Sequence, residues 1–189
     1  MSQVEIRLAE SADIPALRGL QERSLRVLGR RHYSATQIEA FIARIGTMDD
    51  YLVSDSTYLV AEVDGEILGC AGWTTRLPGY AHRAQSEAHV PDPSRATIRS
   101  VFVEPLAARQ GIGRNIMSAV ENALRSEGFR SAELGATENS TTFYRGLGYQ
   151  QLGAFHVDVG NGITMGLTRM RKMLAPTNLD ETSPALMSA

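Results

Sequence analysis

Two glycines and two arginines stand just before a strongly amphipathic stretch, in the run Ala-Arg-Gln-Gly-Ile-Gly-Arg that ends at Arg114. Glycine costs a helix interior about 1 kcal/mol relative to alanine, so glycines at a helix start need another explanation. A helix start carries unpaired amide N–H groups and partial positive charge, and glycine lets a ligand approach them without meeting a Cβ atom. The amides from Gly111 onward, with the guanidinium groups of Arg109 and Arg114, therefore predict a pyrophosphate-binding site.

Two common phosphate-binding motifs do not fit this stretch. A Walker loop requires Lys followed by Ser or Thr after its second glycine, and Arg114 and Asn115 stand there instead. A dinucleotide-binding fingerprint requires a third glycine near Ile116, which is an apolar position of the amphipathic pattern. The glycine pair alone is equally compatible with a tight turn before a helix, so the flanking segments must decide.

The flanking segments supply a composite pattern over residues 98–149: a strand, a proline, the glycine stretch, an amphipathic helix, a strand, Asn139 and Phe-Tyr-Arg-Gly-Leu-Gly-Tyr. This pattern resembles the GNAT N-acetyltransferase superfamily, whose signature Gln/Arg-x-x-Gly-x-Gly/Ala holds the pyrophosphate of acetyl-coenzyme A. Gly111 and Gly113 match the two glycines. Ala108 stands where the family has Gln or Arg, which is a departure at one side-chain contact.

The resemblance implies the roles of individual residues. The strand that contains Val103 would pair with the pantetheine arm, and the amide near Val103 would polarise the thioester carbonyl and stabilise the oxyanion. Tyr144 would lie near the sulfur as general acid, and no metal is implied. The residues that the resemblance assigns to acetyl-CoA binding are Val101, Phe102, Val103, Arg109, Gln110, Gly111, Ile112, Gly113, Arg114, Asn139 and Tyr144.

Direct acyl transfer to an amine also requires a base, because an alkylamine such as lysine has a pKa of about 10.4 and is mostly protonated at neutral pH. Glu133, in the strand expected beside the cofactor, is the candidate that we add to the catalytic residues. His82, Glu87 and His89 in a long loop are alternatives, and each of these groups also fits a surface or structural role. Arg99 either binds an acidic group of the substrate or is a solvated arginine.

The acceptor is predicted only by class. In the family, substrate walls usually come from the first two helices, the loop before the cofactor strand and the final hairpin, here residues 18–46, 76–95 and 156–168. These segments mix both signs of charge and contain no long basic or acidic run, which favours a small or amino-acid-like amine over a histone-like tail. A catalytically silent acyl-CoA sensor or partner-binding module on the same fold is the alternative; Tyr144 and the intact glycines favour the enzyme.

Periodicity along the rest of the chain predicts the elements that position these residues. The order is β-α-α-β-β-β-α-β-α-β-β, with a strand at residues 4–8, a helix at 36–45 and a hairpin around Asp64-Gly65. Together with the resemblance, this order predicts a mixed α/β fold with a twisted, mostly antiparallel sheet of about seven strands and helices on both faces. We expect one domain over residues 1–174 and a polar tail over 175–189.

Composition narrows the class of protein. The chain has 189 residues and a formal net charge of -2, which gives no bulk electrostatic reason to bind nucleic acid or an anionic membrane. No run of about 18 apolar residues or signal-like segment is evident. Cys70 is the single cysteine, so no internal disulfide can form, and its apolar neighbours predict a buried strand residue. These features favour a cytoplasmic protein that binds acetyl-CoA and an amine, with a homodimer as one possible assembly.

Overall fold

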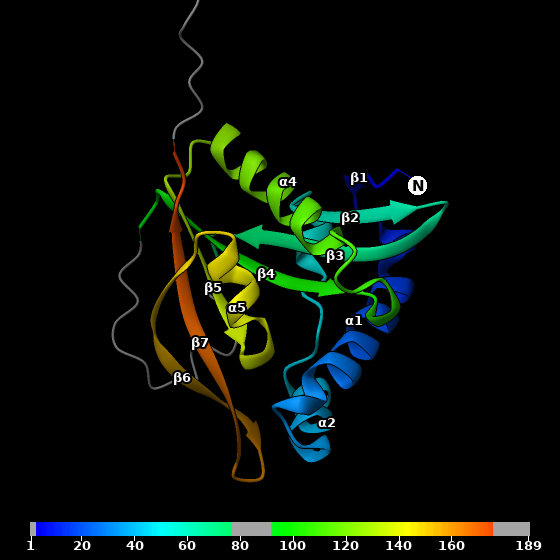
Figure 1. Ribbon diagram of the computed structural model, residues 1–189, viewed down its shortest axis with the longest axis vertical. Coiled ribbons are helices and arrows are strands. Elements are labelled where there is room, and N and C mark those ends of the chain that lie inside the picture. The colour runs from blue at the N-terminus through cyan, green and yellow to red at the C-terminus, as the bar shows by residue number, and fades with distance from the viewer. Residues whose placement is uncertain (1–2, 77–91, 176–189) are drawn as a thin grey trace, which may run out of the picture.

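The computed structural model describes residues 3–76 and 92–175, and its strands form one seven-stranded sheet in the order β1-β2-β3-β4-β5-β7-β6. Neighbouring strands are antiparallel except β4 and β5, which are parallel. The predicted mixed, mostly antiparallel sheet is therefore confirmed (Figure 1). The strands are β1 (Glu5–Leu8), β2 (Tyr58–Val63), β3 (Glu66–Thr74), β4 (Arg95–Val103), β5 (Ser131–Thr137), β6 (Gln150–Gly160) and β7 (Ile163–Met173).

Helices cover both faces of this sheet, as predicted: α1 and α2 lie on one face, and α4 and α5 on the other (Figure 1). The short helix α3 was not predicted, because four residues are too few to show a helical period. Most of the predicted tail lies outside the described residues. The helices are α1 (Ile14–Leu28), α2 (Ala35–Arg44), α3 (Tyr51–Ser54), α4 (Ile112–Ser126) and α5 (Thr141–Gly146), with 3₁₀ turns at Ser11–Asp13, Gly29–Arg31, Pro105–Ala107 and Glu138–Ser140.

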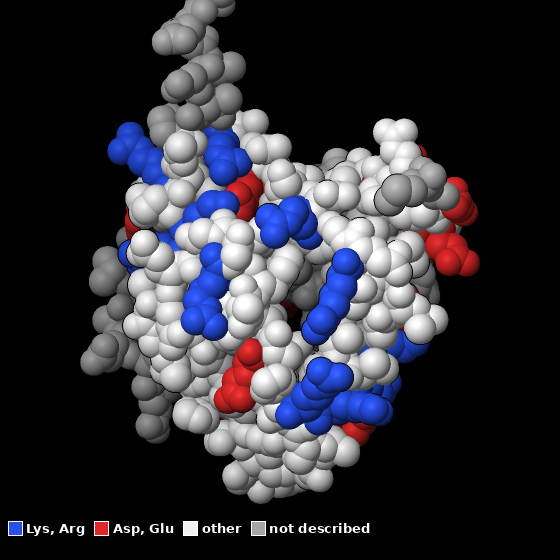
Figure 2. Space-filling model, viewed as in Figure 1, with Lys and Arg blue, Asp and Glu red and all other residues white. Residues whose placement is uncertain are grey.

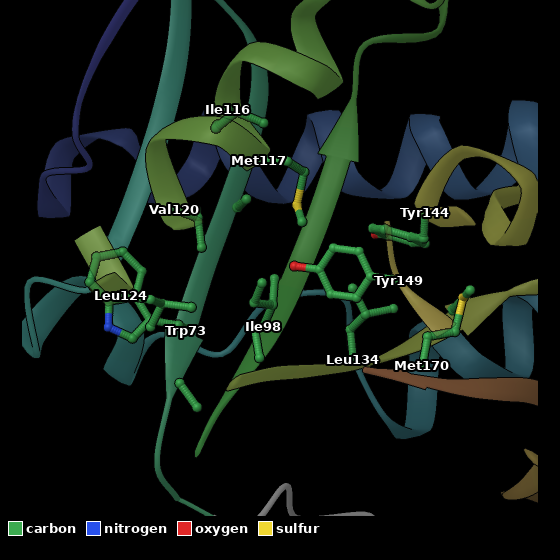
Figure 3. Packing of buried hydrophobic residues seen from close by; sticks show 14 of the residues in the cluster. Trp73, Ile98, Ile116, Met117, Val120, Leu124, Leu134, Tyr144, Tyr149 and Met170 are labelled. Carbon is green, nitrogen blue, oxygen red and sulfur yellow. The ribbon is translucent and has the colours of Figure 1, made fainter. Parts of the chain in front are cut away.

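Helix α4 has the strongest local signals for its start and its buried face. Gly111 occupies the N-cap position in the left-handed region with φ 90°, which favours glycine. Ile112, Ile116, Val120 and Leu124 repeat at four-residue spacing and are all at most 3% exposed. All four belong to one buried cluster, of which Figure 3 labels Ile116, Val120 and Leu124, so burial of this stripe fixes the helix over β2, β3 and β4.

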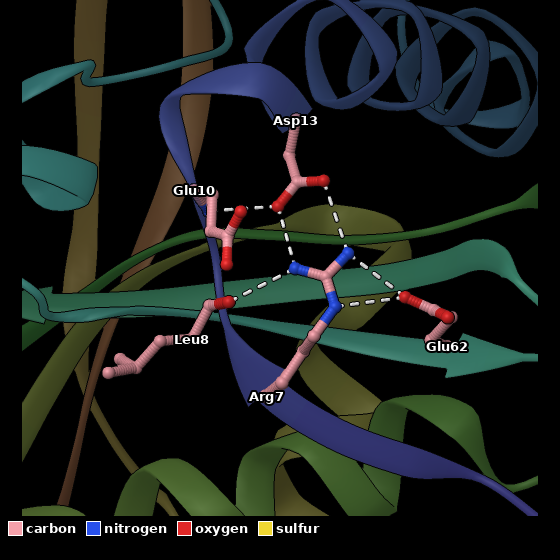
Figure 4. A network of polar contacts seen from close by, with 5 residues as sticks. All are labelled: Arg7, Leu8, Glu10, Asp13 and Glu62. Carbon is pink, nitrogen blue, oxygen red and sulfur yellow. Dashed lines mark hydrogen bonds and ion pairs between the residues drawn. The ribbon is translucent and has the colours of Figure 1, made fainter.

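A polar network fixes the first strand to the start of α1 (Figure 4). The Arg7 guanidinium donates to both carboxylate oxygens of Asp13 at 2.7 and 3.1 Å, and to Glu62 on β2 at 2.9 Å. Asp13 also accepts from the backbone N–H of Glu10 at 2.8 Å. Chiefly through the hydrogen bond from Arg7, this arrangement lowers the pKa of the Asp13 carboxyl.

Strand β4 carries a bulge where it pairs with β3. Cys70 lies opposite Phe102, and the next register pair joins Gly72 to Arg99, so β4 has one more residue than β3 between these pairs. Ser100 lies in the bulge with φ 51°, a left-handed conformation that is uncommon for a residue other than glycine. The bulge interrupts the regular ladder and changes the direction of the backbone that follows.

Buried hydrogen bonds hold the bulge in place. The Tyr58 hydroxyl on β2 donates to the Ser100 carbonyl at 3.0 Å and accepts from the Gln21 side-chain amide on α1 at 2.5 Å. Tyr58, Gln21 and Cys70 are all 0% exposed, which confirms the predicted burial of the cysteine. Burial raises the pKa of the Cys70 thiol to about 11, so the thiol is protonated at neutral pH.

Candidate active site

Strands β4 and β5 diverge after three paired positions. Their parallel register ends at the pair Thr97–Glu133, after which β4 continues along β3 to Val103 and β5 continues along β7 to Thr137. Beyond Thr97 and Glu133, the facing edges of these two strands have no strand partner within residues 3–76 and 92–175. Backbone N–H and C=O groups on such an edge are ready to pair with an extended ligand.

A pocket of about 1130 Å³ occupies the gap between β4 and β5. Gly113 and Tyr144 line it from the face that carries α4 and α5, whereas Leu25 and Phe41 line it from the face that carries α1 and α2. Figure 2 shows a hollow near the centre of one face of the molecule, with Lys and Arg side chains beside it. Because pockets for one small ligand usually measure about 300–1,000 Å³, this space suits a long ligand with a second, smaller one.

The start of α4 lies at the edge of the pocket and has the properties of an anion site. The first backbone bond back to Gly111 comes from the Asn115 N–H, and the amides of Ile112, Gly113 and Arg114 have no backbone partner within the described residues. A Cβ atom placed on Gly111 would meet no atom within 4 Å, so this backbone faces open space. These amides can therefore bind phosphate oxygens directly.

The side chains around the glycines differ in where they point. Arg109 and Arg114 line the pocket and are exposed, and neither forms an ion pair or hydrogen bond within the part of the chain that the structure describes. The Gln110 side-chain amide instead donates to the Leu106 carbonyl at 3.0 Å. Ile112 buries its side chain in the core at 3% exposure, so its amide alone is placed for a ligand.

The unpaired part of β4 brings three predicted residues to the pocket. Val101, Phe102 and Val103 all line it. Val101 and Val103 pack against the cluster beneath α4, whereas Phe102 packs against the clusters beneath α1 and α2. Side chains of a strand alternate between its faces, so the free backbone edge of β4 lies between both sets of side chains. Asn139, just after β5, lines the same pocket and is exposed.

Tyr144 lines the pocket from α5 and is 6% exposed. Its ring lies 5.1 Å from that of Phe143 and 5.7 Å from that of Tyr149 in edge-on contacts, and Figure 3 shows it extending from α5 toward β4. Its hydroxyl forms no hydrogen bond within the described ranges. Burial raises the pKa of Tyr144, which keeps the hydroxyl protonated and able to donate.

The structure does not bring Glu133 to the pocket. The residue is 8% exposed, and its carboxylate contacts the Arg171 guanidinium on β7 closely and lies 3.4 Å from Arg95 on β4. Glu133 therefore joins three strands at the closed end of the gap. The other base candidates, His82, Glu87 and His89, lie outside the described residues.

The sequence left open whether Arg99 is a solvated arginine, and the structure shows that it is not. Its side chain is 10% exposed, forms an ion pair with Asp49 at 2.9 Å, and donates to the Tyr51 hydroxyl at 3.3 Å. Sequence reasoning missed Asp49 as a residue of the pocket, which it lines from the connection between α2 and α3. Its surroundings, Gly-Thr-Met-Asp-Asp, resemble an ordinary polar turn, and nothing local indicates that they pack on β4.

The comparisons with known proteins support the same class as the fold and the pocket. The model of the acetyltransferase (GNAT) family matches residues 19–149. A GCN5-related N-acetyltransferase from Rhodopseudomonas palustris superposes with a TM-score of 0.71 at 20% identity, over 92% of this chain and 98% of the other. No curated protein matches the chain in sequence.

Two further similar structures were solved with the cofactor. An N-acetyltransferase from Thermoplasma acidophilum in complex with coenzyme A has a TM-score of 0.65 at 16% identity, over 90% of this chain and 99% of the other. A putative acetyltransferase from Salmonella typhimurium with its cofactor acetyl-CoA has a TM-score of 0.62 at 21% identity, over 98% of this chain and 100% of the other.

The chain belongs to the GNAT acetyltransferase family. It is an acyltransferase. The acetyl-CoA that the family resemblance implied agrees with the coenzyme A and acetyl-CoA bound in two of the similar structures. Within residues 3–76 and 92–175, no helix has the length and apolar character needed to cross a membrane. In the same residues, no group of three or more His, Cys, Asp or Glu side chains is arranged to hold a metal ion.

Proposed function

We propose that this enzyme transfers the acetyl group of acetyl-CoA directly to the primary amine of a small or amino-acid-like acceptor. The observation that carries the proposal is a single pocket that passes between β4 and β5 and is lined from both faces of the sheet. One side has the anion site at the start of α4. The other side is bounded by α1 and α2, which leave room for a compact acceptor.

The chain's own groups supply the steps of a direct transfer. The amides at Gly111 and beyond bind the pyrophosphate, and the free edge of β4 near Val103 orients the pantetheine arm and donates to the thioester carbonyl. Attack by the amine nitrogen forms a C–N bond, and collapse of the intermediate breaks the C–S bond. The buried Tyr144 hydroxyl donates a hydrogen bond or proton to the departing sulfur.

Ligand binding tests the cofactor site of this protein. Acetyl-CoA should raise the melting temperature, because a ligand at a hundred times its dissociation constant adds about 2.7 kcal/mol of apparent stability. ATP and NAD should raise it much less, and an equal shift with ATP would indicate a general nucleotide site.

Gly111→Asp should abolish the acetyl-CoA shift, since it adds a Cβ atom and a negative charge to the anion site. Gly65→Asp in the β2–β3 turn is the matched control, because Gly65 has φ 83° and equally open surroundings but does not line the pocket. Loss of the shift in both variants would show that backbone strain, and not the missing anion site, is responsible.

Tyr144→Phe tests the chemistry. The substitution keeps the ring and removes the donor, so we expect turnover to fall roughly ten- to a thousandfold, toward the low end of general-acid effects because a thiolate leaves readily. The dissociation constant for acetyl-CoA should change less than about tenfold. Tyr149→Phe, which alters the neighbouring ring outside the pocket, should keep near-normal turnover. If Tyr144→Phe turned over at the wild-type rate, Tyr144 would have only a packing role and the general-acid assignment would be wrong.

The alternative, a silent acyl-CoA sensor, rests on Ala108 at the position where the family has Gln or Arg. Release of free thiol in the presence of a panel of primary amines distinguishes the two functions. An enzyme consumes thioester steadily with at least one amine, whereas a sensor binds acetyl-CoA and shows no acceptor-dependent release.

A further inference from the structure

One acidic side chain stands out in the acceptor half of the pocket. Of the Asp and Glu residues that the structure describes, Asp49 is the one that lines the pocket. Its side chain is 22% exposed, so it is partly enclosed but accessible from the cavity. Five arginines line the same pocket, so this carboxylate has either a structural role as an ion-pair partner or a ligand-binding role.

The carboxylate of Asp49 is held on the bulge of β4 through one of its two oxygens. The Arg99 guanidinium lies 2.9 Å from Oδ2, and the Ser100 hydroxyl lies 3.5 Å from the same oxygen. No hydrogen bond to Oδ1 is present within residues 3–76 and 92–175. A purely structural ion pair with arginine commonly uses both oxygens in a fork, whereas here one acceptor stays open.

Most of the wall that α1, α2 and the segment after α2 contribute to this half of the pocket is hydrocarbon. Arg30, Arg31 and His32, in and just after the 3₁₀ turn Gly29–Arg31, also line the pocket and add two guanidinium groups and an imidazole. An acceptor here would bury a hydrocarbon body, at about 25 cal/mol of stabilisation per Å² removed from water, and would find one negative charge at its end. The apolar residues are Leu25, Leu28, Phe41, Ile45 and Met48.

We propose that Asp49 receives the ammonium group of the acceptor at Oδ1 and that the acceptor is a primary amine carried on an apolar body. This inference rests on the proposed acetyl transfer to an amine. Asp49 first pairs with the ammonium and then takes one proton from it. The neutral nitrogen attacks the thioester carbon and forms the C–N bond, the C–S bond breaks, and the sulfur leaves as a thiolate that accepts a hydrogen bond from Tyr144. The nitrogen releases its second proton to solvent as the amide forms.

The charged and titratable groups around Asp49 are consistent with proton acceptance. Burial raises the pKa of the Asp49 carboxyl, and the charge of Asp50 acts in the same direction, while Arg99 and the Ser100 hydroxyl act against them. Tyr51 on α3 and Tyr58 on β2 also face it, and the pKa of each is raised, chiefly by burial. A raised pKa makes the carboxylate a stronger base than an ordinary aspartate at the same pH.

The test compares two adjacent aspartates that undergo the same change. Asp49→Asn removes the base and keeps the shape of the side chain. Asp50→Asn is the matched control, because Asp50 forms an exposed ion pair with Arg18 at 2.5 Å and does not line the pocket. Thermal melting with and without acetyl-CoA checks that each variant folds and binds the cofactor.

We expect Asp49→Asn to lower kcat/KM for an amine about a hundred- to ten-thousandfold while the acetyl-CoA shift is retained. In the wild type, kcat/KM should fall at low pH as Asp49 is protonated, and in the variant the pH profile should follow the pKa of the free amine. Asp50→Asn should stay within threefold of the wild type. An Asp49→Asn enzyme within threefold of the wild type and with the same pH profile overturns the inference.

A second measurement needs no variant. The wild type should prefer hexylamine to 1,6-diaminohexane, because the second ammonium of the diamine would lie against hydrocarbon or face the guanidinium groups of Arg30 and Arg31. Equal kcat/KM for the two amines overturns the apolar half of the proposal. Acetyl-CoA binding without turnover of any amine overturns the proposed function, and this inference with it; turnover that does not depend on Asp49 overturns the inference alone.

Discussion

Tyr58→Phe is the sharpest test of how the fold positions the pocket. The substitution keeps a fully buried ring and removes one hydroxyl, which donates to the Ser100 carbonyl at 3.0 Å and accepts from the Gln21 amide at 2.5 Å. The loss leaves two buried polar groups without their partner on opposite sides of the deleted atom. The Gln21 side-chain oxygen already has no hydrogen-bond partner, so a 180° rotation of the amide group would not provide a partner for its N–H groups.

The expected cost follows from these two groups. Each buried polar group left unpaired costs about 1–3 kcal/mol, and we expect about 2–4 kcal/mol in total because the Gln21 amide retains a weak contact with the Cys70 sulfur at 3.8 Å. For a chain of this size, 1 kcal/mol corresponds to roughly 2–4 °C, so the melting temperature should fall by roughly 4–16 °C. The freed bulge at Ser100 should also weaken acetyl-CoA binding, by up to about tenfold.

A double-mutant cycle with Gln21→Met separates this network from general damage to the core. Methionine fills a similar volume without polar atoms, so adding it to Tyr58→Phe should recover at least about 1 kcal/mol of the loss. Denaturant unfolding of the wild type, both single variants and the double variant gives the coupling energy. Effects of the two substitutions that add within about 0.5 kcal/mol would refute the claim that these residues act as one network.

Other perturbations have equally direct outcomes. Gly72→Ala should destabilise the fold by about 1–3 kcal/mol in denaturant unfolding, because its Cβ atom would lie 2.5 Å from the Tyr58 ring, where a packed core gives little room. The Cys70 thiol, with a pKa raised to about 11 by burial, should not react with a thiol reagent at pH 8 until the protein unfolds. Arg7→Gln should cost up to about 1 kcal/mol at pH 7. Because Arg7 lowers the folded-state pKa of Asp13, the contribution of this pair is present above about pH 4 and disappears as the pH falls through the folded value, which unfolding curves at several pH values can follow.

Much of the fold follows from local sequence patterns. The four-residue apolar stripe of α4 and the glycines at its start indicate the buried face and the first turn of this helix without any tertiary information. The Asp64-Gly65 pair fixes the β2–β3 hairpin, since both residues adopt positive φ there. These features depend on backbone preferences and side-chain periodicity over a few residues, which is why the sequence predicts them.

Tertiary structure decided which acidic side chain reaches the pocket. In the sequence, Glu133 lies in the predicted cofactor strand, but three-strand packing pairs it with Arg95 and Arg171 and removes it from the pocket. In the sequence, Asp49 lies in a short polar segment that has no distinguishing motif. The bulge of β4 and the packing of the α2–α3 connection bring its carboxylate against Arg99, where it lines the pocket. Strand register and long-range packing fix these positions, and both depend on residues 38 to 51 positions apart that no local pattern connects.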